Sequence, residues 1–145
     1  MPYEEEEAIR AIIRKRCPVH EPDFTLALEI GMRRGQLDAL EWDRVDLKRR
    51  QILLLMTKNG TSRVVILTER AVKAVEELQE RRSTEIPQVC LARYGEPKVS
   101  PRAWFELVME ESVKQNRALK DVTWHVFPHT SICRLVMARV DLRTV

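Results

Sequence analysis

One hairpin signal lies within a chain whose other patterns are helical. Two apolar runs, residues 51–56 and 62–67, flank Lys58-Asn59-Gly60. Asn-Gly tolerates the positive φ angles that a tight turn requires, so this pattern predicts two antiparallel strands joined at that point. Because the hairpin stands among helical segments, we expect an α+β fold in which a small sheet is combined with helices.

Apolar residues at helical spacing predict helices on both sides of the hairpin. Segment 4–16 has acidic residues in its first turn and basic residues in its last, as the helix dipole favours, and Pro18 should end it. The expected helices are 4–16, 21–30, a short one across 37–42, 68–82, 100–109 and 130–138, with a third short strand at 87–91. The prediction is a mainly α-helical α+β domain of residues 1–145 with a small three-stranded antiparallel sheet.

The composition indicates one compact domain without a targeting segment. A chain of 145 residues, 44% of them hydrophobic, is long enough to bury one core. No apolar run approaches the roughly 20 residues of a membrane span. Residues 1–7 are acidic where a secretory signal is basic and then apolar. We therefore expect a cytoplasmic protein with no membrane partner.

The net charge of +3 is modest and unevenly distributed. Residues 1–7 contain four glutamates, whereas the carboxy-terminal end of the chain is basic. From Ser112 onward the basic residues are Lys114, Arg117, Lys120, Arg134, Arg139 and Arg143, against Asp121 and Asp141. Such an excess is expected where a protein contacts phosphates, but solvated helix faces give the same count, so charge alone does not choose between the two.

No cofactor and no metal site are expected. Cys17, Cys90 and Cys133 are few, scattered and odd in number, which argues against a disulfide framework and fits buried reduced thiols. Cys17 and His20 form a single pair of candidate ligands, and a zinc site needs about four.

Two segments carry residues suited to phosphate chemistry. The first, Gly31-Met32-Arg33-Arg34-Gly35, interrupts the second expected helix. An arginine presents a planar fork that can donate two parallel charge-assisted hydrogen bonds to a phosphate. Taken alone, the segment equally fits solvated arginines at a helix end. The second segment, residues 125–130, reads His-Val-Phe-Pro-His-Thr.

Three segments, in this order, resemble the catalytic domain of the tyrosine recombinases, the phage integrase family. Residues 29–36 are similar to the family's Thr-Gly-Met-Arg-Arg-Gly-Glu, residues 57–60 to its hairpin lysine, and residues 125–130 to its His-x-x-Arg-His-Thr. The resemblance covers residues 4–145 and implies the family's helical catalytic domain with its small antiparallel sheet. No single segment would be specific enough by itself.

The resemblance implies a catalytic role for each matching residue. Arg33 would grip the non-bridging oxygens of the scissile phosphate, Lys58 would protonate the leaving 5′ oxygen, and His125 would assist proton transfer. The residues expected to contact DNA are Arg34, Lys58, His129 and Arg134. The family uses no metal and no cofactor for this chemistry.

Departures from the family pattern predict loss of catalysis. Pro128 stands where the family has its second active-site arginine, and Gln36 stands where it has glutamate. Loss of one oxyanion donor costs on the order of 10²–10³ in rate. The sequence ends at Val145, before the position of the family's nucleophilic tyrosine. Its two tyrosines, Tyr3 and Tyr94, are expected to be surface or packing residues.

These features lead to two functional hypotheses. The first is a DNA-binding fragment or degenerate member of the site-specific tyrosine recombinases, prokaryotic or phage-derived, which is inactive by itself and binds double-stranded DNA weakly with steep salt dependence. The second is a non-catalytic protein-interaction or regulatory module on the same scaffold. A third interpretation is an ordinary mixed α/β domain whose motif matches are accidental.

The family's terminal helices, which carry the tyrosine, would follow Val145. Without them, apolar side chains should be exposed at Leu135, Val136, Val140 and Leu142. We therefore expect a homo-oligomer or pairing with a full-length recombinase. The recombinase hypothesis also requires that Arg33, Lys58 and His125 converge on one concave, positive face.

Overall fold

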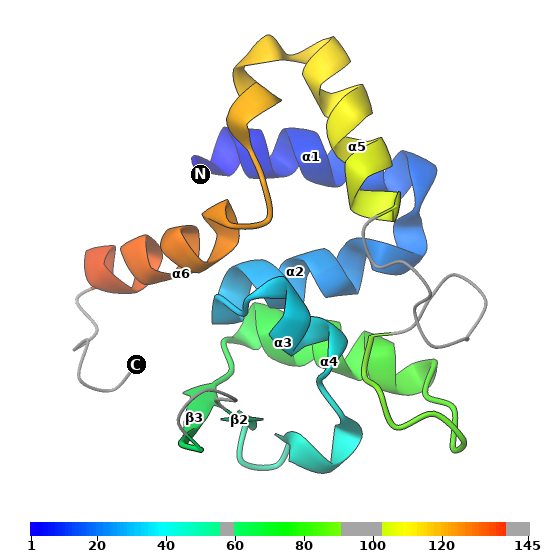
Figure 1. The fold of residues 1–145 in the computed structure, drawn as a ribbon, viewed down its shortest axis with the longest axis vertical. Coiled ribbons are helices and arrows are strands. Elements are labelled where there is room, and N and C mark those ends of the chain that lie inside the picture. The colour runs from blue at the N-terminus through cyan, green and yellow to red at the C-terminus, as the bar shows by residue number, and fades with distance from the viewer. Residues whose placement is uncertain (56–59, 91–102, 139–145) are drawn as a thin grey trace.

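The computed structural model describes residues 1–55, 60–90 and 103–138, which form several helices and one small sheet at the edge of the molecule (Figure 1). The helices are α1 (Tyr3–Arg16), α2 (Glu21–Ile30), α3 (Arg34–Asp38), α4 (Glu69–Glu80), α5 (Ala103–Gln115) and α6 (Val126–Met137), with short 3₁₀ helices at Pro18–His20, Trp42–Arg44 and Arg117–Asp121. The strands are β1 (Val45–Asp46), β2 (Gln51–Leu55) and β3 (Ser62–Ile66). The predicted mainly helical α+β fold with a three-stranded antiparallel sheet is confirmed.

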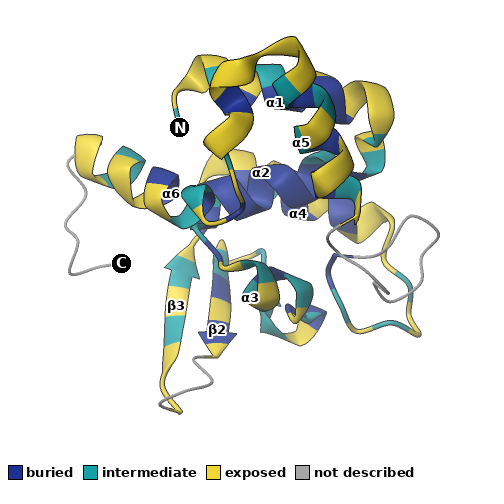
Figure 2. Cartoon of the chain, turned by 45° about the horizontal axis from the view of Figure 1, so that its top comes forward, coloured by how far each residue is buried: buried dark blue, intermediate teal, exposed yellow. Residues whose placement is uncertain are grey.

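Helix α2 lies at the centre of the core. Eight of its ten residues are buried, and it packs against α4 and α6, while α1 packs against α5 (Figure 2). A helix that is apolar on nearly all sides is covered on nearly all sides. The predicted start of α2 near Pro22 is confirmed, as is its interruption at Gly31. Because α2 is central and buried, the position of Gly31 at its end is fixed by the core.

The sheet has one covered face and one open face. Ile52 and Leu54 of β2 are buried, whereas Leu53 of β2 and Val64 and Ile66 of β3 are exposed. Leu53 and Val64 are paired across the two strands. This alternation follows from the two-residue period of a strand, because neighbouring side chains point to opposite faces.

The strand predicted at 87–91 is not part of the sheet. Instead, the Trp42 amide donates to the Pro87 carbonyl at 2.9 Å and the Val89 amide donates to the Leu40 carbonyl at 2.8 Å. This pairing takes residues 40–42 out of the predicted short helix, so α3 ends at Asp38. The third strand is β1, which was expected only as a turn into extended chain. One long-range contact therefore accounts for both errors.

Helices α4 and α6 differ from their predicted bounds by a few residues. The Thr68 hydroxyl caps α4 by accepting a hydrogen bond from the Ala71 amide at 3.1 Å, as predicted, and α4 ends two residues before the expected position. The predicted start of α5 at Ser100-Pro101 lies outside the described residues, and so does residue 91. Helix α6 begins at Val126, four residues earlier than predicted.

Candidate functional site

Gly31, at the end of α2, packs against the first turns of α6. It has a φ of 61°, a left-handed conformation that favours glycine, and its amide donates to the Ala27 carbonyl at 3.1 Å. A Cβ atom at this position would lie 2.9 Å from Ser131 Cβ and 3.5 Å from Pro128 Cα. Only glycine allows both the turn and this close approach. The segment with Arg33 is therefore held against the helix that follows His125.

A side-chain hydrogen bond strengthens the same contact. The Ser131 hydroxyl donates to the Glu29 carbonyl at 3.1 Å, and Ser131 is buried. Serine hydroxyls commonly bond to backbone carbonyls in this way. The two segments that resemble separate catalytic motifs thus meet through both backbone and side chain. We call residues 31–35 and 124–128 the Arg33–His125 site.

Arg33 is exposed at the start of α3. Its amide donates to the Gln36 Oε1 atom at 3.1 Å, so Gln36 caps the helix. At this position the expected orienting glutamate is replaced by a neutral side chain. Within the described part of the chain, none of the ion pairs includes the Arg33 guanidinium, whereas the neighbouring Arg34 lies near Asp38.

His125 is exposed immediately before α6. Trp124, its neighbour, is 7% exposed and lies against Phe105 and Phe127, with ring centres 5.1 and 5.0 Å away. This aromatic cluster fixes the backbone that presents His125. The imidazole is therefore displayed from a rigid support rather than from a loose loop.

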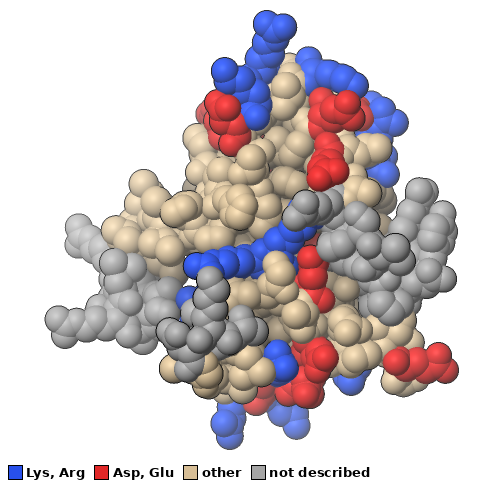
Figure 3. Space-filling view, viewed as in Figure 1, with Lys and Arg blue, Asp and Glu red and all other residues tan. Residues whose placement is uncertain are grey.

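A hollow of about 660 Å³ lies beside these residues. It is lined by Arg34, Gly35, Asp38, Phe105, Glu106, Met109, Val122, Thr123, Trp124 and His125. Of the residues expected to converge on one concave, positive face, His125 lines this hollow, Arg33 does not, and Lys58 lies outside the described residues. Asp38 and Glu106 add acidic groups, so the charge of the hollow is mixed. Figure 3 shows a basic strip across the middle of one face with acidic side chains next to it.

Pro128 is the third residue of α6 and has no N–H to donate. The amides of Val126 and Phe127 donate to the carbonyls of Thr123 and Trp124 at 3.0 and 3.2 Å. Proline fits the first turn of a helix because the missing amide would have no partner there. The helix start is therefore intact although it offers no guanidinium at this position.

His129 and Lys58 are two other predicted site residues. His129 is exposed on α6, next to Pro128. Lys58 lies outside the described residues. The strands on either side of it are paired as expected, since Leu55 of β2 faces Ser62 of β3, and Gly60 has a φ of 63°. The roles assigned to His129 and Lys58 stay predictions.

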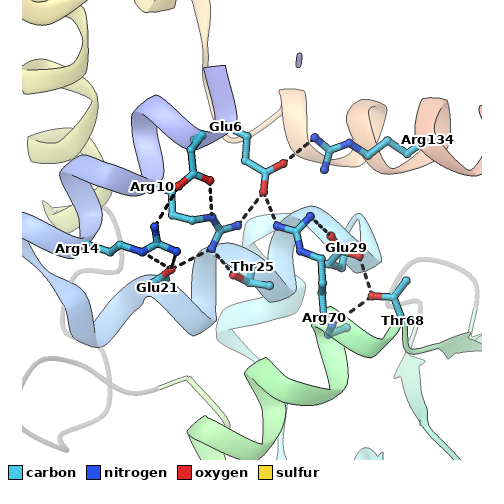
Figure 4. Close-up of polar contacts among 11 residues, drawn as sticks. Glu6, Arg10, Arg14, Glu21, Thr25, Glu29, Thr68, Arg70 and Arg134 are labelled. Carbon is cyan, nitrogen blue, oxygen red and sulfur yellow. Dashed lines mark hydrogen bonds and ion pairs between the residues drawn. The ribbon is translucent and has the colours of Figure 1, made fainter. Parts of the chain in front are cut away.

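Arg134 contacts a buried carboxylate instead of solvent. Its Nη2 donates to Glu6 Oε2 at 2.7 Å (Figure 4), and its guanidinium lies 4.2 Å from the centre of the Tyr3 ring. The Arg134 side chain is 19% exposed. A direct DNA contact by Arg134 stays a prediction, although its Nη2 is already engaged by Glu6 within the protein.

Glu6 is the centre of a cluster that the sequence pattern did not reveal. Its carboxylate also accepts hydrogen bonds from Arg10 of α1 and Arg70 of α4 (Figure 4). We call Glu6, Arg10, Arg70 and Arg134 the Glu6 junction, which ties α1, α4 and α6 together. Position 6 shares a helix face with the core residues at 9 and 13, and this spacing could have indicated that Glu6 is buried.

The arginines of the junction keep Glu6 ionised. Burial by itself raises the pKa of Glu6, but hydrogen bonds from Arg10, Arg70 and Arg134 outweigh that effect and lower the pKa from 4.5 to about 2. Glu6 is only 2% exposed, so the three guanidinium groups replace its lost hydration. Residues 1–7 are thus not merely an acidic end, because one of their glutamates is part of the core.

Neither the cysteines nor the possible metal ligands of the described residues add a site. Cys90 is buried, Cys17 is half-buried and Cys133 is exposed, so the expectation of buried thiols is right for Cys90 and wrong for Cys133. Among residues 1–55, 60–90 and 103–138, no three His, Cys, Asp or Glu side chains lie where they could share a metal ion. In the same part of the chain, no helix has the length and apolar character that crossing a bilayer requires.

Comparison with known proteins relates both sequence and fold to one family. The sequence profile of the phage integrase family matches residues 4–145. A shufflon-specific DNA recombinase of Escherichia coli is 50% identical over 48 residues, which are 33% of this chain and 12% of that protein.

Two solved structures have similar folds. The crystal structure of the XerA recombinase aligns with a TM-score of 0.77 and 20% sequence identity. The aligned region covers 99% of this chain and 53% of the XerA chain. The integrase of the Tn1549 transposon, in complex with circular intermediate DNA, has a TM-score of 0.77 and 21% identity, with the same coverage. The chain thus spans about half the length of these two proteins.

Proposed function

Because the chain belongs to the phage integrase family, we propose that it is a catalytic-domain portion of a site-specific DNA recombinase and that it binds the backbone of double-stranded DNA. The observation that carries this proposal is the close approach of Gly31 to Pro128 and Ser131. A phosphate bound at the Arg33–His125 site would meet an exposed guanidinium and an exposed imidazole.

Each proposed residue contributes a different group. Arg33 donates charged hydrogen bonds to non-bridging phosphate oxygens, since its exposed guanidinium has no carboxylate partner within the described residues. His125 donates or accepts a proton at the reacting oxygen. Lys58, on the hairpin between β2 and β3, is the proposed acid that protonates the leaving 5′ oxygen. His129 is proposed as a second contact beside His125.

Relatives support a DNA partner. The Tn1549 integrase was solved with circular intermediate DNA, and the Escherichia coli relative is a DNA recombinase. At 20–21% identity the structural likeness concerns the fold, so DNA binding by this chain is our proposal. Electrostatic contacts to phosphates make such binding weaken steeply as salt is added.

We propose that the chain by itself binds DNA without cleaving it. Pro128 removes one donor from the phosphate site, and the first amides of α6 are already used in the helix. Loss of one such donor slows acyl or phosphoryl chemistry by about 10²–10³. Tyr3 lies against Arg134, and Tyr94 is outside the described residues. A nicked suicide substrate should therefore trap no covalent protein–DNA adduct.

A protein-interaction role is the second candidate function. It is favoured by apolar side chains on two surfaces, Leu53, Leu55, Val64 and Ile66 of the sheet and Ile132, Val136 and Met137 of α6. The predicted exposure of Val136 is confirmed, whereas Leu135 is only half-exposed; Val140 and Leu142 lie outside the described residues. Exposed apolar groups of this kind are typical of contact surfaces. Pairing with another recombinase copy would fit them.

Fluorescence anisotropy with a labelled DNA duplex tests the proposed function. The wild-type chain should bind weakly, and the affinity should fall linearly with salt on a log–log plot. The double variant Arg33→Ala, His125→Ala should bind roughly fiftyfold more weakly than the wild type, because a charge-assisted hydrogen bond contributes about 1.5–3 kcal/mol and the imidazole adds a second contact. Circular dichroism should show an unchanged helical content.

The matched control is Lys73→Ala, which removes an exposed basic residue from α4. This control should change the affinity less than twofold, within the roughly ±0.5 kcal/mol expected of a surface substitution. Equal losses in the control and the double variant would show that DNA binding depends only on total charge. Absence of any salt-dependent binding by the wild type would reject the DNA-binding proposal.

A further inference from the structure

We propose that Arg34 is a positioning residue that sets the distance between Arg33 and His125 through its contact with Trp124. The inference rests on the proposed function, because it concerns the neighbours of the two phosphate-binding candidates. Arg34 directly follows Arg33, and Trp124 directly precedes His125. The Arg34 guanidinium carbon lies 5.3 Å from the centre of the Trp124 ring. One cation–π contact thus links the two candidates.

Trp124 is a rigid support for this contact. It is only 7% exposed, and its ring packs against Phe105 and Phe127 and lies 6.0 Å from the ring of Trp104. Three aromatic rings from α5 and α6 therefore hold it in one orientation. A guanidinium stacked on Trp124 has a fixed surface beneath it. Any shift of that guanidinium changes the position of α3 relative to the start of α6.

Arg34 is held on its own side as well. Its Nε lies 3.9 Å from Asp38 Oδ2, one turn further along α3, and the two side chains are 21% and 22% exposed. The guanidinium therefore lies between a carboxylate and an aromatic face, within the protein. This arrangement supports a positioning role, and the direct DNA contact that the sequence pattern predicted for Arg34 stays a prediction.

The Arg34 contact is one of two that bracket the site. Gly31 precedes Arg33 in the chain and contacts Pro128 and Ser131 in the first turns of α6, and Arg34 follows Arg33 and contacts Trp124. In the sequence, His125 lies between Trp124 and Pro128. Two contacts restrict rotation of one segment against the other, whereas one contact would act as a hinge. The Gly31 contact is made by the backbone, so only the Arg34 contact can be removed without straining the turn.

Salt dependence distinguishes positioning from direct phosphate binding. Each phosphate contact that is lost should reduce the slope of log affinity against log salt by about 0.9. Loss of a positioning contact should lower the affinity by the same factor at every salt concentration. Arg34→Ala should therefore weaken duplex binding roughly five- to tenfold without changing the slope. A slope reduced by about 0.9 would show that Arg34 binds phosphate and would overturn the inference.

A double-mutant cycle tests whether Arg34 acts through Trp124. Trp124→Phe keeps an aromatic ring but presents a weaker surface for a cation. It should weaken duplex binding about two- to threefold, and the double variant Arg34→Ala, Trp124→Phe should bind no more weakly than Arg34→Ala alone. Multiplicative losses would show that the two residues act independently, which contradicts the inference. Thermal melting should confirm that all three variants are folded.

A readout without DNA separates this inference from the proposed function. The imidazole signals of His125 and His129 can be recorded by NMR in the free protein, and both residues are exposed. Arg34→Ala should shift and broaden the His125 signals, while those of His129 stay in place as an internal reference. Unchanged His125 signals would overturn the positioning role even if the chain binds DNA. Shifted signals in a chain that does not bind DNA would reject the proposed function alone.

Discussion

The Glu6 junction and the Arg33–His125 site use arginines in opposite ways. In the junction, Arg10, Arg70 and Arg134 surround a carboxylate that is 2% exposed. In the site, Arg33 is exposed and pairs with no carboxylate in the described part of the chain. A basic residue can therefore belong to the core or to a binding surface, and its charge alone does not tell which. An arginine that pairs with a buried carboxylate, such as Glu6, contributes to the structure of the core.

The largest expected effect is loss of the Glu6 carboxylate. Glu6→Ala should lower the free energy of unfolding by about 3 kcal/mol, because Arg10, Arg70 and Arg134 would lose the buried carboxylate that they share, even though Arg10 keeps Glu21 and Arg70 keeps Glu29. Chemical denaturation followed by circular dichroism measures this change. Glu4→Gln is the control, since Glu4 is exposed, and it should change stability by less than about 0.5 kcal/mol. Equal effects of both substitutions would contradict the structural role of the junction.

Acid should remove the same stabilisation. Because folding lowers the pKa of Glu6 from 4.5 to about 2, its contribution is complete above pH 4.5 and is lost as the pH falls through 2. The wild type should therefore lose about 3 kcal/mol more than Glu6→Gln over this range. Denaturation curves of the two proteins at pH 5, 4, 3 and 2.5 measure the difference. Parallel curves would mean that Glu6 has an ordinary pKa in the folded protein.

Single arginine substitutions sharpen the contrast between the two regions. Arg33→Ala should weaken duplex binding about tenfold and reduce the salt slope by about 0.9, with little change in melting temperature. Arg134→Ala should lower stability by about 2 kcal/mol through the loss of its bond to Glu6 and leave the salt slope unchanged. Anisotropy titrations and thermal melting measure both properties. A reduced slope for Arg134→Ala would restore its role as a DNA contact.

The smallest expected effect concerns Pro128. Pro128→Arg would add a guanidinium to the first turn of α6 and should strengthen duplex binding about threefold, with a steeper salt slope. Stability should change by less than about 1 kcal/mol, because arginine is a good helix former. Pro128→Gln is the neutral control and should leave the slope unchanged. No gain in affinity for Pro128→Arg would place this helix turn away from the bound phosphate.

Local patterns predicted most of the fold. Helical spacing identified α1, α2 and α4, the Asn-Gly turn identified the pairing of β2 with β3, and Thr68 was correctly expected to cap α4. The errors came from contacts between distant segments. Residues 40–42 pair with residues 87–89, which ended α3 early and left 87–91 outside the sheet. Helical propensity cannot anticipate a competing partner about 45 residues away.

The candidate site was predicted less evenly than the fold. The sequence related Arg33 and His125 to one family, and Gly31 indeed brings their segments together. The interpretation of Gln36 as a missing acidic partner did not include its capping of α3. The DNA contact expected of Arg34 stays a prediction, and the positioning role is our proposal. The contact of Arg34 with Trp124 depends on the packing of α3 against the start of α6.

The sequence by itself determined the order of the helices, the hairpin, the family and the identity of the departures at Pro128 and Gln36. The elements depend on patterns of residues close together in the chain, and the family depends on three such patterns in order. Tertiary structure alone decided which partners the buried charges have, since Glu6 and Arg134 are 128 residues apart. A charged group leaves water only when its partner arrives with it. Whether an arginine belongs to the core or to the exposed site therefore depends on the tertiary structure.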